Sequence, residues 1–574
     1  MLCLGLPAGL GLGYQAPMSN AAIYFHPDGY DTGRDRLMGR HAAGESFLRG
    51  LIRHGQIDTH YLFNATASAP SQLEPLVKKI EPTTKPLVWY DRRSRARLAQ
   101  PGNLFNPGPN IATEAWHRRP WGAQSYGICG ITHTTATHRV MDSIAELLTA
   151  PLEPWDTLIC TSAAVRHSVD VELEAVQEDL SSRLGMTRFS KPRLETIPLG
   201  VNVADFQTNP TDRKAWRTKL GIPDDAVVAI FLGRFSAAAK MNPALMAMAL
   251  EAAAKQSGKE VHWICAGWSV TDQATEVHHK NTRQFCPSVH YHAVDGRPLD
   301  ARFSIWSAAD IFISLSENIQ ETFGLTPVEA MAAGLPCVVT DWDGYRDTVR
   351  HGLDGFRIAT VFPRPGLGRD LSYAFANEWL TYDGYIAAAA QMTAVDIQAA
   401  TEALVALIQN PDLRATMGAS AAKQARDVFD WAAIIPRYQA LWGEMNAMRL
   451  AGPRLPIPAD PDNPRRLDPF RLYASYPTAA SGPATQITVP ADMTWPLAEE
   501  ILARPFASMA SWTMPFPAER RQMFDFFAQN PGAPISNMLV GFPPNRKPFI
   551  ERGVLWLVKF GILALVNPAP VPKD

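Results

Sequence analysis

Short apolar, β-branched runs alternate with stretches rich in Ala, Leu and Met along most of this chain. Such runs predict strands that are buried on both faces of a parallel sheet, and the stretches between them predict helices that cover the sheet. Nine runs are expected to be strands: 21–25, 87–90, 127–132, 157–161, 226–233, 261–267, 289–294, 310–316 and 336–340. Because strand and helix alternate from about residue 21 to 430, the pattern predicts doubly wound α/β sheets.

The alternation is too long for one sheet, and residues 194–206 fall in its middle as a joint. We therefore expect two facing Rossmann-like domains, an N-terminal one at 18–200 and a C-terminal one at 201–430. The apolar residues 1–17 carry no Lys or Arg, which a signal peptide needs before its apolar stretch. We expect this segment to be a disordered extension, with Met18 as the alternative start.

The end of the chain departs from the alternation. Residues 431–450 predict a helix with one apolar stripe that crosses back to the first domain, and the prolines that follow predict a semi-rigid linker at 451–466. A separate, mainly helical module is expected at 467–574. Its predicted elements are helices at 518–529 and 545–559 and a strand at 561–566, which by analogy alone resemble a winged helix.

Composition excludes several classes of protein. With 54 Lys and Arg against 56 Asp and Glu, the net charge of -2 argues against a protein held on nucleic acid by its overall charge. No two of the six cysteines form a C-x-x-C pair, so we expect neither a disulfide framework nor a zinc site, and we expect a cytoplasmic protein. The apolar stretch 553–566 contains Lys559 and is too short to span a membrane, so a buried helix and strand is the better interpretation.

Candidate chemistry gathers after the strand at 310–316, where carboxylates flank the start of a helix. Thr326 is expected to be the N-cap and Pro327 the first helical residue, so Glu329 would complete a capping box and serve the fold alone. The loop 321–325 is harder to explain by folding. It connects a buried strand to a helix N-terminus, where backbone N–H groups and the helix dipole favour a phosphate.

A second loop carries cations. Residues 229–243 predict a strand, a turn, and a helix with Asn242 as N-cap and Pro243 at its first position. Arg234 and Lys240 flank this turn. Taken alone, each is as well explained as a solvated loop cation.

Together these segments carry a family resemblance. Glu321 and Glu329 form E-x7-E within E-T-F-G-L-T-P-V-E-A-M-A-A-G-L-P, and Arg234 and Lys240 follow a strand as G-R-x5-K. This pattern resembles the retaining glycosyltransferases of glycosyltransferase family 4 (glycosyl transferases group 1), which have the GT-B architecture. The resemblance covers about residues 20 to 450 and is most specific between 228 and 345.

The resemblance implies transfer of a sugar from a nucleotide-diphosphate sugar, with retention at the anomeric carbon. Arg234 and Lys240 would stabilise the departing diphosphate, Glu321 would orient the sugar, and Glu329 would hold the ribose. Further donor contacts are implied at Gly233, Gly267, Thr322, Phe323, Gly324 and Leu325. The family uses no metal and no cofactor beyond this co-substrate, and the D-x-D at 341–343 follows the wrong strand, so we expect it to shape a loop.

The first half offers weaker candidates. Gly44 and Glu45 resemble the family's G-G-x-E loop, although a small residue at a helix start explains Gly44 equally well. His133 follows a strand at a position where the family contacts the donor sugar, but a lone His there also serves as a packing residue; His138 is the lesser candidate. The cluster Arg92, Arg93, Arg95 and Arg97 is expected to be a solvated loop, with an anionic lipid head group or phosphorylated acceptor as the sharper alternative.

Three hypotheses follow. The first is a retaining sugar transferase with an unknown acceptor, such as a glycan, a lipid-linked sugar or a small molecule. The second is a non-catalytic protein of the same fold that binds a nucleotide sugar or glycan, and the third is an epimerase or phosphorylase. Peripheral contact with the inner face of the membrane, and a protein partner or self-association through the C-terminal module, are further expectations.

Overall fold

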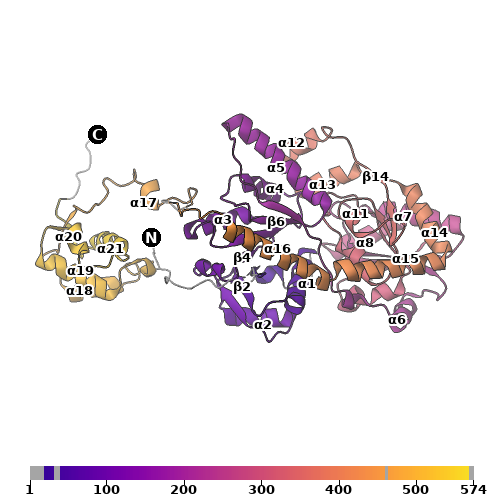
Figure 1. The fold of residues 1–574 in the computed structure, drawn as a ribbon, viewed down its shortest axis with the longest axis horizontal. Helices are drawn as coiled ribbons and strands as arrows, with labels where there is room; N and C mark the ends of the chain where they lie inside the picture. Colours follow the sequence, from indigo (N-terminus) through magenta and orange to yellow (C-terminus); the bar gives the residue numbers. More distant parts are fainter. Residues whose placement is uncertain (1–18, 31–38, 459–462, 568–574) are drawn as a thin grey trace. The chain divides into compact units, whose positions relative to one another are not determined.

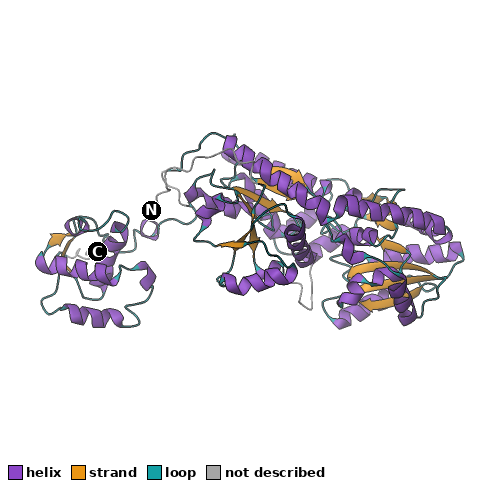
Figure 2. Cartoon of the chain, turned by 60° about the horizontal axis from the view of Figure 1, so that its bottom comes forward, coloured by secondary structure: helices purple, strands orange, loops and turns teal. Residues whose placement is uncertain are grey.

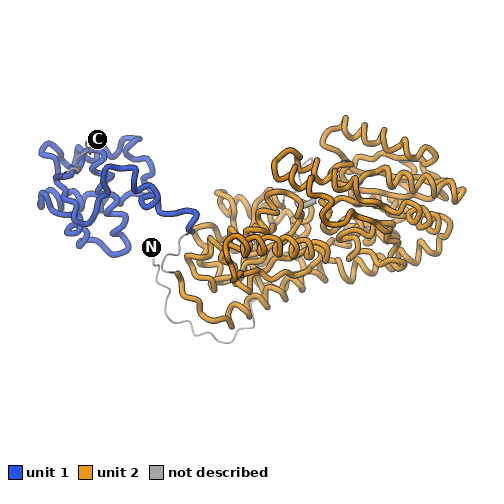
Figure 3. The backbone as a smooth tube through the Cα atoms, turned by 90° about the horizontal axis from the view of Figure 1, so that it is seen from above, with its two compact units in different colours: residues 1–14, 464–574 blue, residues 15–463 orange. Residues whose placement is uncertain are grey.

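The computed structural model describes residues 19–30, 39–458 and 463–567, and of these the side chains of residues 39 and 40 are not described. Two compact units are separated, one covering 15–463 and a smaller one beginning at Pro464 (Figure 3). The predictions for residues 1–17 and Met18 lie outside the described residues.

A seven-stranded parallel sheet forms the first domain, in the order β3-β2-β1-β4-β5-β6-β7. Its strands are β1 (Ala22–Phe25), β2 (His60–Asn64), β3 (Leu87–Tyr90), β4 (Asn103–Phe105), β5 (Gly127–Ile131), β6 (Thr157–Cys160) and β7 (Arg193–Thr196). Its helices are α1 (Gly39–His54), α2 (Pro70–Ile80), α3 (Ile111–Arg118), α4 (His138–Ala145) and α5 (Ala163–Leu184) (Figure 1). The order 3-2-1-4-5-6 is that of a Rossmann fold.

The second domain repeats this order in a six-stranded parallel sheet, β10-β9-β8-β11-β12-β13. Its strands are β8 (Val227–Arg234), β9 (Val261–Trp268), β10 (His290–Asp295), β11 (Ile311–Ser314), β12 (Cys337–Thr340) and β13 (Gly355–Ile358). Its helices are α6 (Pro210–Leu220), α7 (Pro243–Ser257), α8 (Asp272–Arg283), α9 (Leu299–Phe303), α10 (Leu325–Ala332), α11 (Tyr345–Thr348), α14 (Ile397–Gln409) and α15 (Pro411–Gln424). Helices flank the strands of both sheets (Figure 2), so the predicted pair of Rossmann-like α/β domains is confirmed.

All nine predicted strands are present with ends shifted by at most two residues, but β2, β4, β7 and β13 were not predicted. These four are short or carry polar residues. In β4, for example, the buried Asn103 amide donates to the carbonyl oxygens of Asn20 and Trp442, both at 3.1 Å. Acceptors from distant segments thus satisfy the buried N–H groups of this side chain, which no local sequence pattern would reveal.

An excursion leaves the second domain after β13. It consists of the antiparallel pair β14 (Thr360–Val361) and β15 (Ala394–Val395), with α12 (Arg369–Ala376) and α13 (Tyr382–Gln391) between them. Phe375 of α12 stacks on His138 of the first domain, with ring centroids 3.7 Å apart, and the His138 Nε2 lies 2.9 Å from the Phe375 carbonyl oxygen. This excursion therefore contacts both domains.

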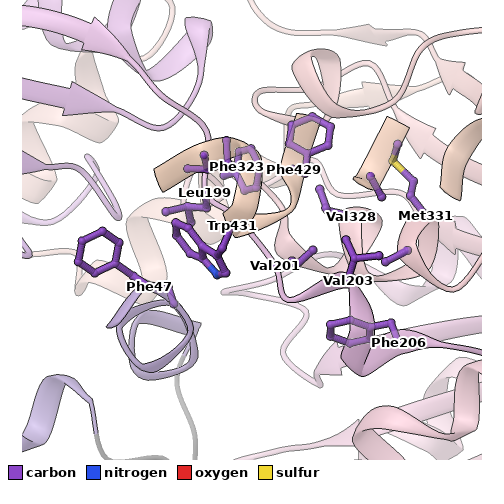
Figure 4. Close-up of a cluster of buried hydrophobic side chains, with 14 of the residues drawn as sticks. Phe47, Leu199, Val201, Val203, Phe206, Phe323, Val328, Met331, Phe429 and Trp431 are labelled. Atoms are coloured by element: carbon purple, nitrogen blue, oxygen red, sulfur yellow. The ribbon is translucent and has the colours of Figure 1, made fainter. Parts of the chain in front are cut away.

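The joint between the domains is an apolar cluster. Val201 and Asp430 form a bridge, so the chain leaving the first domain lies beside the chain returning to it. Helix α16 (Trp431–Ala451) then packs against α1, and Trp431 Nε1 donates to Ser46 Oγ at 2.7 Å. Figure 4 shows Trp431 and Phe429 beside Phe323 in this cluster. The predicted apolar stripe of the crossing helix is buried: Trp431, Ile435, Tyr438, Leu441, Trp442 and Met445.

The smaller unit has a core of its own. Its elements are α17 (Pro469–Leu472), β16 (Gln486–Thr488), α18 (Trp495–Ala503), α19 (Pro517–Gln529), β17 (Ala533–Pro534), α20 (Ile535–Leu539), α21 (Lys547–Lys559) and β18 (Ala564–Leu565). The strands form an antiparallel sheet in the order β17-β16-β18. The two predicted helices and the strand are present, while the winged-helix analogy and a partner for this unit remain predictions. Among the described residues, no helix is both long and apolar enough to cross a membrane.

Candidate functional site

Two glycines lie side by side where β8 and β9 end. Gly233 is the register partner of Gly267, and a Cβ added to Gly267 would lie 1.9 Å from the Gly233 carbonyl oxygen. Gly296, just past β10, donates its N–H to the Gly267 carbonyl at 3.1 Å. The strand ends pack so closely that Gly267 has no room for a side chain, so backbone alone lines this part of the carboxyl edge of the sheet, beside its switch point.

Lys240 lies in the turn after β8, and the loop after β11 holds that turn in place. Glu317 Oε1 accepts from the Asn242 backbone N–H at 2.9 Å, and the Asn318 amide donates to the Ala238 carbonyl at 2.7 Å. Ser316 Oγ donates to the Lys240 carbonyl at 3.3 Å. The backbone around Lys240 is therefore positioned by a segment more than seventy residues away in sequence.

The central contact of the site is an ion pair between Lys240 Nζ and Glu321 Oε2. Burial alone would raise the pKa of Glu321. The charge and hydrogen bond of Lys240, together with hydrogen bonds from the backbone of Thr322 and Phe323, outweigh burial and hold that pKa below its ordinary value. Glu321 is thus a carboxylate with a fixed orientation, and the Lys240 ammonium beside it is a cation that can also pair with a bound anion.

Arg234 ends β8 on the other side of the same turn. With its amide oriented to satisfy both ends, Gln320 accepts from Arg234 Nη2 at 2.9 Å and donates to Tyr382 Oη and the Ala239 carbonyl, both at 3.2 Å. Tyr382 comes from α13. The excursion after β13 therefore contributes a residue to the surroundings of Arg234.

The helix that follows Glu321 begins earlier than predicted. Gly324 is the N-cap of α10, with φ +87, and a Cβ there would lie 2.1 Å from Tyr345 Cε1. The capping-box prediction is wrong, because Thr326 and Pro327 already lie inside the helix and no side chain caps it. Glu329 is consequently left without a capping role, and burial raises the pKa of its carboxyl despite the charges of Arg302 and Lys240.

Loops of the first domain contact this segment. Thr322 Oγ1 donates to the His133 carbonyl at 3.0 Å, and Thr161 Oγ1 donates to the Thr322 carbonyl at 3.3 Å. His133 follows β5 and Thr161 follows β6, so the carboxyl ends of both sheets meet at Thr322. The structure therefore places His133 next to the loop of Glu321, through its backbone.

The predicted loop at Gly44 is corrected, and the predicted donor contact of Phe323 is left to its backbone. Gly44 lies in the interior of α1 rather than in a loop, and a Cβ there would lie 2.2 Å from the Gly29 carbonyl oxygen. Its N–H serves the helix, and the absence of a side chain serves close packing. Phe323 points its side chain into the joint cluster, with its ring centroid 6.1 Å from that of Phe429, so that only its backbone faces Glu321 (Figure 4). Leu325 is the first residue of α10.

The D-x-D segment shapes a loop and joins the domains. Asp343 has φ +41 and accepts from Ser162 Oγ at 3.0 Å, and Asp347 accepts from the Ala163 N–H at 2.7 Å. Burial and the neighbouring Glu321 raise the pKa of Asp343 to about 7. The two aspartates thus meet the N-terminus of α5, where the helix dipole favours negative charge.

The arginine cluster is more than a solvated loop. Arg95 is buried, pairs with Glu114 at 2.5 Å and lies over the Phe63 ring. On α1, Arg49 pairs with Asp205 and Arg53 pairs with Glu81. The solvated-loop prediction is therefore wrong for Arg95, and peripheral membrane contact remains a prediction.

A switch point lined by glycines, with two cations and a helix N-terminus beside it, is the kind of site that binds a phosphorylated nucleotide. Residues 212–362 match the family Glycosyl transferases group 1. The match covers β8 to β13 and thus Gly233, Arg234, Lys240, Glu321 and Glu329.

Two curated relatives are named as D-inositol 3-phosphate glycosyltransferases. A D-inositol 3-phosphate glycosyltransferase from Geodermatophilus obscurus is 30% identical over 183 residues, which cover 28% of this chain and 36% of the relative. One from a Nocardioides species is 26% identical over 285 residues, which cover 47% of this chain and 60% of the relative. The alignments thus span less than two thirds of these relatives. Among solved structures, Anabaena HepE in complex with UDP and glucose has a TM-score of 0.45 at 15% identity, covering 73% of this chain and 98% of that one.

Sequence reasoning missed Glu317, Asn318, Gln320 and Tyr382. The first three belong to the run S-E-N-I-Q-E directly after a buried strand, and three polar residues in such a place are a usable signal. Tyr382 had no such signal, because it reaches the site only through the fold of the excursion.

Proposed function

We propose that this protein is a glycosyltransferase that moves a sugar from a nucleotide-diphosphate sugar to an acceptor, with retention and without a metal. The observation that carries the proposal is the Lys240–Glu321 ion pair beside the glycine-lined ends of β8 and β9, with Arg234 on the same turn. An ammonium, a guanidinium and a helix N-terminus suit a diphosphate, and an oriented carboxylate suits sugar hydroxyls.

In this proposal the bond between the anomeric carbon and the diphosphate oxygen breaks, the acceptor's hydroxyl oxygen bonds to the anomeric carbon on the same face, and the hydroxyl proton passes to the departing diphosphate. The charge that develops on the diphosphate is stabilised by Arg234 and Lys240. Preorganised donors of this kind contribute about 3–4 kcal/mol each. The donor's phosphate would compete with Glu321 for Lys240, so that the carboxylate becomes available to a sugar hydroxyl. Glu329, freed from a capping role, would accept from the ribose.

The acceptor is open to direct testing. The curated relatives are named for transfer to D-inositol 3-phosphate. A phosphorylated cyclitol is therefore a first acceptor to try, beside glycan, lipid-linked and small-molecule acceptors.

The decisive experiment supplies the full chain with a panel of UDP-, GDP- and ADP-sugars, with and without EDTA, and measures nucleotide release in the presence of each acceptor. Release with one donor that persists in EDTA supports the proposal. No release with any donor contradicts it, and tight donor binding without release favours the alternative, a non-catalytic nucleotide-sugar-binding protein. Loss of release in EDTA contradicts the metal-free part.

A further inference from the structure

Four metal-binding side chains share one face of the second sheet, at the end opposite the proposed donor site. Glu260 directly precedes β9, and His262 lies two residues farther on the same strand. His290, the first residue of β10, is the register partner of His262, and His292 follows two residues later. Side chains alternate between the faces of a strand, so this spacing brings the carboxylate and the three imidazoles together.

The geometry of the group is that of a ligand set. The Glu260 Oε1 oxygen lies 2.9 Å from His262 Nε2 and 3.5 Å from His290 Nε2. In a tetrahedral zinc site with bonds near 2.0–2.2 Å, neighbouring ligand atoms are about 3.4 Å apart. Within the part of the chain that the structure describes, Glu260, His262 and His290 form a group that could hold a metal ion, because their ligand atoms all lie within 4.8 Å of one another.

His292 supplies the outer contact that metal-bound histidines usually have. Its Nε2 lies 2.8 Å from His262 Nδ1, and the two rings are nearly parallel, 5.1 Å apart. If His262 Nε2 binds a metal, its Nδ1 carries the proton and donates to His292, which fixes the tautomer and the ring orientation.

We infer that Glu260, His262 and His290 bind a divalent transition-metal ion, Zn²⁺ in the first place, with His292 as the orienting residue. Two imidazoles and one carboxylate with an open fourth position are a known zinc set. Glu260 and His290 have side chains 49% and 57% exposed, so water can complete the coordination.

The site lies away from the proposed donor site. His262 lies five residues before Gly267 on β9, which corresponds to about 16 Å along a strand. β10 is the outermost strand of its sheet, paired with β9 alone. A metal held by His262 on β9 and His290 on β10 would tie this edge strand to its neighbour. The inference does not depend on the proposed function.

The test is equilibrium dialysis of the chelator-treated full chain against ZnCl₂, with bound zinc counted by elemental analysis. Wild type and the control His167→Ala, which removes an exposed histidine of α5, are expected to bind one zinc per chain. Glu260→Gln and His290→Ala should weaken binding at least tenfold, and His292→Ala about 10- to 100-fold, as is usual for outer contacts.

Equal zinc affinity in Glu260→Gln, His290→Ala and wild type would overturn the inference, as would the absence of stoichiometric zinc in wild type. X-ray absorption at the zinc edge gives a second measurement that does not depend on the variants. Two imidazole ligands are expected in the wild-type spectrum, and a spectrum without imidazole would show adventitious zinc and overturn the assignment.

Discussion

Replacing Lys240 with Met removes the ammonium of the central ion pair while keeping most of the side-chain volume. If the proposed function is correct, the loss of one preorganised donor to the departing diphosphate should lower kcat/KM by about a hundredfold to a thousandfold. The variant also leaves Glu321 without its cation. The partners are only 19% and 13% exposed, so we expect the unfolding free energy to fall by about 1–3 kcal/mol, the cost of leaving a buried polar group unpaired.

The loss of stability has a predictable pH dependence. Lys240 is the main reason that the pKa of Glu321 is lowered in the folded protein, and burial opposes it. A lowered folded-state pKa stabilises the fold above the unfolded pKa, and this stabilisation is lost as pH falls through the folded value. Without Lys240, burial raises the pKa of Glu321, so the variant should be least stable relative to wild type near neutral pH and recover towards acidic pH.

The double variant Lys240→Met/Glu321→Gln separates folding from function. It removes the unpaired charge, so thermal unfolding should return towards that of wild type, while nucleotide release stays low. Lys255→Met is the matched control, because Lys255 is an exposed lysine of α7 that pairs with Glu251 on the same helix, and the rate of this variant should equal that of wild type. A folded Lys240→Met protein with an unchanged kcat/KM for every donor would refute the assignment of the site.

Three further predictions concern the same loops. Gly324→Ala should lower the free energy of unfolding in urea by more than about 1 kcal/mol, because Gly324 has φ +87 and a Cβ there would lie 2.1 Å from a carbon of the Tyr345 ring. Gly258→Ala should lower it less, because Gly258 has φ +63 but open space around it. Equal losses in the two variants would contradict the steric argument. Burial raises the pKa of Glu317 to about 7, so the fold loses stability as pH rises from about 4.5 to 7 and Glu317 becomes charged. The melting temperature of Glu317→Gln should therefore rise relative to that of wild type across this pH range. A difference in melting temperature that stays constant with pH would show that Glu317 does not titrate there. Thr322→Val should lose about 1 kcal/mol by removing the hydrogen bond to the His133 carbonyl, and an unaltered urea midpoint would show that this contact contributes nothing.

Local pattern was sufficient for the larger part of the fold. A strand buried on both faces is apolar throughout, and most of the nine predicted strands are of this kind, so the α/β class was visible in the sequence alone. Short spacings were equally legible: E-x7-E and G-R-x5-K placed Glu321, Glu329, Arg234 and Lys240 beside strand ends and a helix start. These features depend only on residues that are close together in the sequence, so a short stretch of sequence is enough to predict them.

What the pattern did not contain are the contacts between distant segments. Helix α10 begins at Leu325, and its N-cap is Gly324, where the Tyr345 ring leaves no room for a side chain. Glu329 is therefore not part of the predicted capping box. The sequence around Gly44 resembles a ligand-binding loop, but in the structure it is a helix that packs against the Gly29 carbonyl. The pairing of Lys240 with Glu321, and of His262 with His290, requires the parallel sheet to bring separate strands together. Burial, charge compensation and close packing are properties of that three-dimensional arrangement, and they decided which of the predicted residues meet.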